Sequence, residues 1–388
     1  MIRRDSIAAV PAAVVAALAA SLVLVGAAFA GTQEDAKVER GLERLTTKVE
    51  GGPPGASVIV LRGDRKQFFT SGVANVETAK PFTPNKKMRI ASTSKAFSGA
   101  VALSLVDQGE LSLDDTIGER LPGLAPKWDA VTLRQVLNHT GGLPNFTTDP
   151  GFQAYFGAHL TERGITIPEL VDFVADKDLR YPPGTEYEYS NTDNLVVALF
   201  AEQATGKTYE ELLRDLVFEP LGLERTWLPG GTRLPGPRIE GYDTLPEVEN
   251  ITSCCSMAFV SASGGLYSTP FELAEFMRAY AGGQMFGPAV RREQRTTFAG
   301  GGSEPPGPGA QSAGLAVFKY ETRCGTVFGH TGNFPGYTQF AATNRRGTKS
   351  VAVSANRQLA PDAPGIKAPE AFVHLQKLFE DAVCAMRS

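Results

Sequence analysis

Ser92 and Lys95 are the first residues of this chain whose types and spacing could do chemistry. Positions three apart in a helix lie on one face, so Lys95 would return one turn later beside Ser92. A serine hydroxyl is a weak nucleophile until a neighbouring base takes its proton, and partial burial can lower the pKa of a lysine enough to help. The pair therefore indicates acyl transfer, whereas a helix cap with a surface lysine is the simpler interpretation of the pair in isolation.

Tyr189 and Asn191 form a second motif, between a Pro- and Gly-rich loop at 181–184 and an expected helix. A phenol near a cationic lysine could be ionised and carry protons, while an amide could orient either a substrate or the lysine. The alternative is an aromatic side chain packed at the helix start, with the asparagine as a cap.

His330, Thr331 and Gly332 form a third motif, at the end of an expected strand. Gly332 would allow another backbone to come close, and a strand edge can pair with an extended, peptide-like substrate. His330 and Thr331 could then contact the anionic end of that substrate. A strand-end histidine with a purely structural role is the alternative.

The elements that must position these motifs indicate an α+β fold. Apolar four-residue spacing followed by Gly109 predicts an amphipathic helix over 92–108, with Ser92 in its first turn. Strand patterns at both ends predict one antiparallel sheet flanked by helices, with an inserted, mainly helical subdomain at about 111–223. Residues 299–309, rich in Gly and Pro, predict a mobile surface loop. The other expected strands are 56–61, 67–73, 314–321, 325–330, 337–343 and 350–354, and the other expected helices include 132–138, 168–175, 194–204, 209–217 and 368–385.

The N-terminus and the composition limit where the protein acts and what it binds. Residues 1–30 combine a basic start, an apolar run and small residues, which predicts a cleaved signal peptide before a linker at 31–37 and one domain at 38–388. We therefore expect an extracytoplasmic protein, with a retained membrane anchor as the alternative and membrane contact only in that case. The net charge of −4 and the lack of a basic block exclude nucleic acid as an expected partner. The four cysteines allow three full pairings, none has metal-ligand spacing, and we expect neither a metal nor a cofactor.

The ordered set of motifs resembles the penicillin-recognising serine enzymes, in which S-x-x-K precedes an S-D-N or Y-x-N element and then a K-T-G or H-T-G element. Its Y-x-N and H-T-G forms are similar to those of the Streptomyces-type D-alanyl-D-alanine carboxypeptidases, a branch close to class C β-lactamases. The similarity covers roughly residues 38–384.

The resemblance implies a role for each matching residue. Ser92 would form an acyl-enzyme while Lys95 and Tyr189 exchange its proton with the leaving group. It further implies that Asn191 holds the acyl side chain and that the N–H groups of Ser92 and Asn333 form an oxyanion hole. His330 and Thr331 would lie beside a substrate carboxylate, with Gly332 where strand and substrate backbones approach. Phe152 and Phe259 would be aromatic walls of the cleft, and Cys324 and Cys384 would form a disulfide.

Two departures concern the substrate. Phe318 stands where the carboxypeptidases place a carboxylate-binding arginine, with Lys319 as a candidate substitute, and Asn333 stands where a hydroxyl is common. The expected function is a D-alanyl-D-alanine carboxypeptidase that acts on peptidoglycan peptides and is acylated by β-lactams. A β-lactamase, an esterase or amidase, and a non-catalytic β-lactam or cell-wall binding protein are the alternatives.

Overall fold

The computed structural model describes residues 31–161, 164–244, 246–296, 298–361 and 369–388. The expected signal peptide at 1–30 and the first residue of the expected final helix lie outside the described residues. Among the described residues, eight strands form one antiparallel sheet in the order β2-β1-β12-β11-β10-β9-β8-β7. Their bounds are β1 Gly55–Arg62, β2 Arg65–Gly72, β7 Phe298–Ala299, β8 Ala310–Ala313, β9 Phe318–Thr322, β10 Gly325–Phe334, β11 Tyr337–Thr343 and β12 Lys349–Ala355.

Two strands from opposite ends of the chain, β1 and β12, are neighbours in this sheet, from Ala56 opposite Ala355 to Arg62 opposite Lys349. The side chains of β1 alternate between two apolar cores, with Ile59 in one and Val60 in the other. A strand that is covered on both faces needs an almost unbroken apolar sequence, which β1 has. The α+β fold predicted from the sequence is therefore confirmed.

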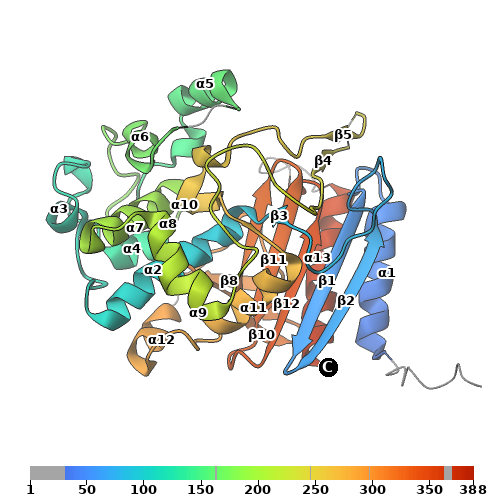
Figure 1. Ribbon diagram of the computed structural model, residues 1–388. Coiled ribbons are helices and arrows are strands. Elements are labelled where there is room, and N and C mark those ends of the chain that lie inside the picture. The colour runs from blue at the N-terminus through green and yellow to red at the C-terminus, as the bar shows by residue number, and fades with distance from the viewer. Residues whose placement is uncertain (1–30, 162–163, 245, 297, 362–368) are drawn as a thin grey trace, which may run out of the picture.

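Helices cover both faces of the sheet (Figure 1). The terminal helices α1 (Gln33–Thr47) and α13 (Glu370–Arg387) pack together on one face, and α11 (Pro270–Tyr280) packs against β11 and β12 on the other. The expected linker at 31–37 is wrong for most of its length, because Thr32 caps a helix that begins at Gln33. None of the helices within the described residues is both long and apolar enough to cross a membrane.

The inserted helices form the other half of the molecule, around α2 (Ser94–Gln108) and α7 (Asn191–Thr205). The sequence predicts α2 as amphipathic, but its side chains are buried on all sides from Ser94 to Leu105 because it lies between the sheet and the other helices. The remaining helices are α3 Ile117–Arg120, α4 Leu133–Leu137, α5 Pro150–His159, α6 Ile167–Asp172, α8 Tyr209–Leu213, α9 Glu219–Leu221, α10 Ser261–Gly264 and α12 Pro288–Gln294; the short strand pairs are β3 Met88–Arg89 with β6 Tyr267–Ser268 and β4 Tyr242–Asp243 with β5 Glu249–Asn250.

Two expectations near the sheet edge are wrong. The expected strand 314–321 begins only at Phe318, as β9. After β8 ends at Ala313, the chain turns through Ala316, whose φ is +50°. The segment 299–309, expected as a mobile surface loop, is anchored: Ser303 is buried, and its hydroxyl accepts a hydrogen bond of 2.9 Å from the Tyr320 hydroxyl. This loop therefore has a defined position beside β10.

Candidate active site

Ser92 lies at the wall of a cavity of about 1000 Å³, in a short 3₁₀ turn (Ala91–Thr93) that leads into α2. The turn is pressed against β10. A Cβ added at Gly332 would lie 2.5 Å from the Ile90 carbonyl oxygen and 3.0 Å from the Ser92 nitrogen. Because no real side chain tolerates such a contact with backbone, glycine at 332 allows this close approach of strand and turn. The motif lies within β10, which continues to Phe334, and not at the end of the strand as expected.

Lys95 lies below Ser92 and is fully buried. Its Nζ donates to the Asn191 side-chain oxygen and to the Ser263 carbonyl oxygen at 2.7 Å each, and it lies 3.2 Å from the Ser92 Oγ. Burial lowers the pKa of Lys95 to about 7, although the negative charges of Glu304 and Asp193 oppose the shift. In its neutral form the amine keeps two N–H donors for Asn191 and Ser263 and has a lone pair free for the serine proton. The arrangement can therefore activate Ser92 at neutral pH.

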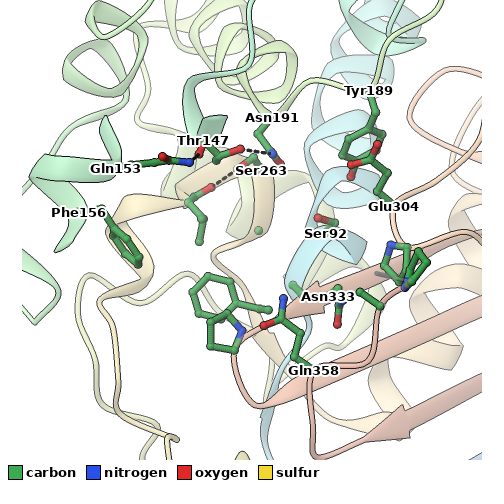
Figure 2. A pocket seen from close by; sticks show the side chains of 18 of the residues that line it. Ser92, Thr147, Gln153, Phe156, Tyr189, Asn191, Ser263, Glu304, Asn333 and Gln358 are labelled. Atoms are coloured by element: carbon green, nitrogen blue, oxygen red, sulfur yellow. Dashed lines mark hydrogen bonds between the residues drawn. The ribbon is translucent and has the colours of Figure 1, made fainter. Parts of the chain in front are cut away.

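Tyr189 lies beside Ser92, at the same end of the cavity (Figure 2). Its ring centre is 4.9 Å from the Lys95 Nζ, and its hydroxyl has no hydrogen-bond partner of normal geometry among the described residues. Burial raises the pKa of Tyr189 well above 10, and the neighbouring Ser92 hydroxyl only partly opposes this. The expectation of an ionised phenol is therefore not met: the ring presents a neutral hydroxyl that can pass a proton on.

A buried pair, His139 and Asp193, supports Tyr189. The His139 ring centre lies 4.6 Å from that of Tyr189, and its Nδ1 lies 2.7 Å from an Asp193 oxygen. Burial lowers the pKa of His139 and raises that of Asp193. The His139 carbonyl also accepts a hydrogen bond from the Glu188 N–H. These contacts fix the loop that presents Tyr189.

His330 and Thr331 lie under the cavity wall and not on its surface. Both are fully buried, and burial lowers the pKa of His330 to about 3, which leaves the ring neutral. The Thr331 hydroxyl donates to the Pro305 carbonyl at 2.6 Å. Phe318 packs against His330 with ring centres 5.0 Å apart, while Lys319 pairs with Glu321 at 2.9 Å. Neither His330 nor Thr331 lines the cavity, so their expected contact with a substrate carboxylate has no support here, and Lys319 pairs with Glu321 instead of facing a substrate.

The cavity end of β10 has an edge that β9 does not cover. The last pair with β9 is Gly329 opposite Phe318, whereas pairing with β11 continues to Phe334. Asn333, in this overhanging part, lines the cavity, and its side-chain oxygen accepts a hydrogen bond from the Thr338 hydroxyl. The overhang is of the kind that can receive an extended substrate.

Aromatic rings from α5 form one wall of the cavity. Phe152 lines it as expected, whereas Phe259 does not and instead packs behind Phe156, with ring centres 5.2 Å apart. Phe156 and Phe334 line the cavity but were not predicted. The four-residue spacing of Phe152 and Phe156, which places both on one helix face, is a signal that could have found Phe156.

Glu304 is the single acidic side chain among the described residues that line the cavity, and no lysine, arginine or histidine is among them. Sequence reasoning missed it because it lies in the loop expected to be mobile. Although the side chain is open to solvent, the cavity walls partly desolvate it and raise the pKa of its carboxyl. Within the described residues, no group of three or more His, Cys, Asp or Glu residues could hold a metal ion.

Both cysteine pairs are at bonding distance. Cys324 and Cys384 lie 5.1 Å apart between their Cα atoms and join the turn between β9 and β10 to α13, so this expected pairing is confirmed. Cys254 and Cys255 also pair with each other, an arrangement that the sequence allowed without favouring it.

Comparison with known proteins shows which family and which curated proteins this chain is similar to. The family model described as Beta-lactamase matches residues 30–375. Among curated proteins, penicillin-binding protein 4 of Amycolatopsis lactamdurans is 31% identical over 186 residues, and penicillin-binding protein 4* of Bacillus subtilis is 29% identical over 183 residues. Each match covers 46% of this chain, but only 46% and 39% of the respective relative, so the chain spans less than half of either protein's length.

Two solved structures share the fold over nearly their whole length. The D-stereospecific amidohydrolase from a Streptomyces species has a TM-score of 0.75 and 27% identity, over 89% of this chain and 98% of its own. The D-amino acid amidase from Ochrobactrum anthropi SV3, complexed with L-phenylalanine amide, has a TM-score of 0.78 over 92% of this chain and 100% of its own; at 24% identity it shows the fold alone. Because the family model matches most of its length, this chain belongs to the beta-lactamase family.

Proposed function

We propose that the protein is an acyl-enzyme amidase in which Ser92 is the nucleophile and a small amide is the substrate. The observation that carries the proposal is the position of the Lys95 amine, which lies within 3.2 Å of the Ser92 Oγ while two oxygens, from Asn191 and Ser263, hold it in place. A buried lysine with a pKa of about 7 suits general-base work, because such catalysis is most effective when the pKa lies near the working pH.

The proposed reaction has two halves. In the first, Ser92 Oγ attacks the amide carbon, its proton passes to the Lys95 amine, and the backbone N–H groups of Ser92 and Asn333 stabilise the oxyanion. Collapse of the intermediate breaks the C–N bond, and the leaving amine takes a proton from Lys95 through the Tyr189 hydroxyl. In the second half, water attacks the ester, and the acid product and free Ser92 are released.

The charges around the cavity favour a neutral amide end over a terminal carboxylate. Binding of a D-alanyl-D-alanine terminus calls for a cationic or donor-rich site, but His330 is buried and neutral and Phe318 occupies the expected arginine position. The likeness to the Streptomyces amidohydrolase supports amide hydrolysis with D-stereospecificity. The carboxypeptidase predicted from the sequence is the second candidate, favoured by the part of β10 that extends beyond its pairing with β9 and by relatives named penicillin-binding proteins.

We also propose that the enzyme acts outside the cytoplasm. Two cysteine pairs at bonding distance support this location, because disulfides persist in oxidising compartments. N-terminal sequencing of the protein exported from its host would test cleavage near residue 30.

A substrate panel tests the proposed activity. We would compare kcat/KM for D-phenylalanine amide, L-phenylalanine amide, an N-acetylated peptide ending in D-alanyl-D-alanine, and a penicillin, with Ser92→Ala as the control. The proposal predicts turnover of the D-amide at least about tenfold faster than of the L-amide or the peptide, with all turnover lost in Ser92→Ala. Faster hydrolysis of the peptide than of the D-amide would instead support the carboxypeptidase.

A further inference from the structure

An unpaired carboxylate, that of Glu304, faces the cavity beside the candidate nucleophile. Figure 2 shows Glu304 next to Tyr189 and on the same side of the cavity as Ser92. The described residues provide no hydrogen-bond or ion-pair partner for it, and its side chain is exposed to the cavity. A surface glutamate needs no partner, but a carboxylate inside a mostly apolar cavity is costly unless some ligand or water satisfies it.

The loop holds Glu304 in this place from both sides. On one side, the Ser303 hydroxyl accepts from Tyr320 and lies 3.2 Å from the Gln311 side-chain oxygen. On the other, the Pro305 carbonyl accepts a hydrogen bond from the Thr331 hydroxyl. Since Ser303, Pro305, Tyr320 and Thr331 are all buried, the backbone around Glu304 is fixed against β9 and β10. The backbone position of Glu304 is therefore set before a ligand binds, which lowers the entropy cost of binding.

The electric field of this carboxylate reaches the reacting groups. Its charge opposes the lowering of the Lys95 pKa and adds to the rise of the Tyr189 pKa, so it acts on the two groups beside Ser92. No cationic side chain is among the described lining residues, and the buried Lys95 amine behind the wall only partly offsets the rise of the Glu304 pKa. An anionic substrate such as a penicillin would acylate Ser92 more slowly, whereas a substrate that brings a positive charge near its scissile carbonyl would be attracted.

We propose that Glu304 binds the ammonium group of the substrate, and that the preferred substrates are aminoacyl amides or esters with a free α-amino group. In such a molecule the amine is attached to the carbon next to the scissile carbonyl. A substrate whose carbonyl reaches Ser92 therefore also brings its ammonium group to the cavity wall that carries Glu304. This inference rests on the proposed amidase function and narrows its substrate class. A charge-assisted hydrogen bond in a partly desolvated site is among the stronger polar contacts.

Paired substrates test this role. We would measure kcat and KM for D-phenylalanine amide and for N-acetyl-D-phenylalanine amide with the wild type, with Glu304→Gln, and with Glu321→Gln as the matched control on the far side of β9. The wild type should prefer the free amine. Glu304→Gln should lose about 10- to 100-fold in kcat/KM for the free amine, chiefly through KM, and little or nothing for the acetylated amide. Glu321→Gln should match the wild type.

A binding measurement separates this inference from the proposed function. In a Ser92→Ala background, calorimetry with D-phenylalanine amide should show that Glu304→Gln weakens binding by a similar factor, whether or not the amide is ever hydrolysed. Loss of kcat for both substrates with unchanged binding would overturn the inference and make Glu304 a base for the hydrolytic water. Unchanged binding and unchanged kinetics in Glu304→Gln would also overturn it, while acylation of Ser92 by a penicillin would leave the proposed nucleophile intact.

Discussion

Asn191→Asp should shift the pH dependence of acylation, because it places a carboxylate against the Lys95 amine. The two atoms concerned are 2.7 Å apart. At an effective dielectric constant of about 20, two unit charges at that distance attract by roughly 6 kcal/mol, which is an upper limit for the stabilisation of the protonated amine. Measured shifts for a neighbouring opposite charge are about 1 to 3 pKa units, and we use that range.

The sign and size of the effect follow from the protonation of Lys95. Only the neutral amine can accept the serine proton, so the rate rises as pH passes the lysine pKa. With a pKa of about 7, roughly half of the wild-type enzyme is competent at pH 7. Raising that pKa to about 8–10 leaves between roughly a tenth and a thousandth competent, so acylation at pH 7 should fall by about 5- to 500-fold and recover at alkaline pH.

The assay is the second-order rate of acylation by a penicillin between pH 5.5 and 9.5, read by intact-protein mass spectrometry after acid quenching. Asn191→Ala is the matched control, since it removes the oxygen acceptor without adding charge and should lower the rate without moving the acid limb to higher pH. If Asn191→Asp slowed acylation equally at every pH, Lys95 would not be the group whose deprotonation limits the reaction.

Three further pairs of variants test the contacts that hold the site and the fold. Gly332→Ala should reduce acylation at least about tenfold with the fold retained, because the new methyl group would meet backbone at 2.5 Å; Gly157→Ala, which meets nothing within 4 Å, is the control in the same assay. Asp193→Ala should destabilise the protein by about 1–3 kcal/mol in urea unfolding and slow acylation, and Asp193→Asn should restore part of both if the hydrogen bond to the histidine is what matters. Cys324→Ser should cost about 2–4 kcal/mol, since that pair closes a 60-residue loop, without changing the acylation rate per folded molecule; Cys254→Ser, whose pair closes almost no loop, should cost far less, and equal losses would contradict this reasoning.

The sequence predicted those parts of the fold that depend on local pattern. The apolar run of β1, the glycine cap after α2 and the close approach at Gly332 follow from strand, helix and backbone rules, and the structure has all three. The two-sided burial of α2 could not be predicted, because its own spacing does not show which elements will cover its polar face.

The groups that shape the cavity were harder to predict, because their positions depend on distant contacts. Glu304 becomes a cavity residue only because Tyr320 and Thr331 anchor its loop, and composition alone pointed to mobility. His330 lies within β10 instead of at its end, and the rings of Phe318 and Tyr189 pack beside it. The family resemblance predicted which residues along the chain carry the chemistry. Which charged groups face the substrate could be seen only in the three-dimensional structure.

The central claim is that Ser92 carries the acyl group, and peptide mapping of a penicillin adduct tests it most directly. After incubation and acid quenching, digestion and tandem mass spectrometry should find one penicilloyl group on the peptide that contains Ser92, with fragment ions that place it on that serine. The adduct should be absent from Ser92→Ala. A stable adduct that maps to another residue, or that persists in Ser92→Ala, would contradict the account.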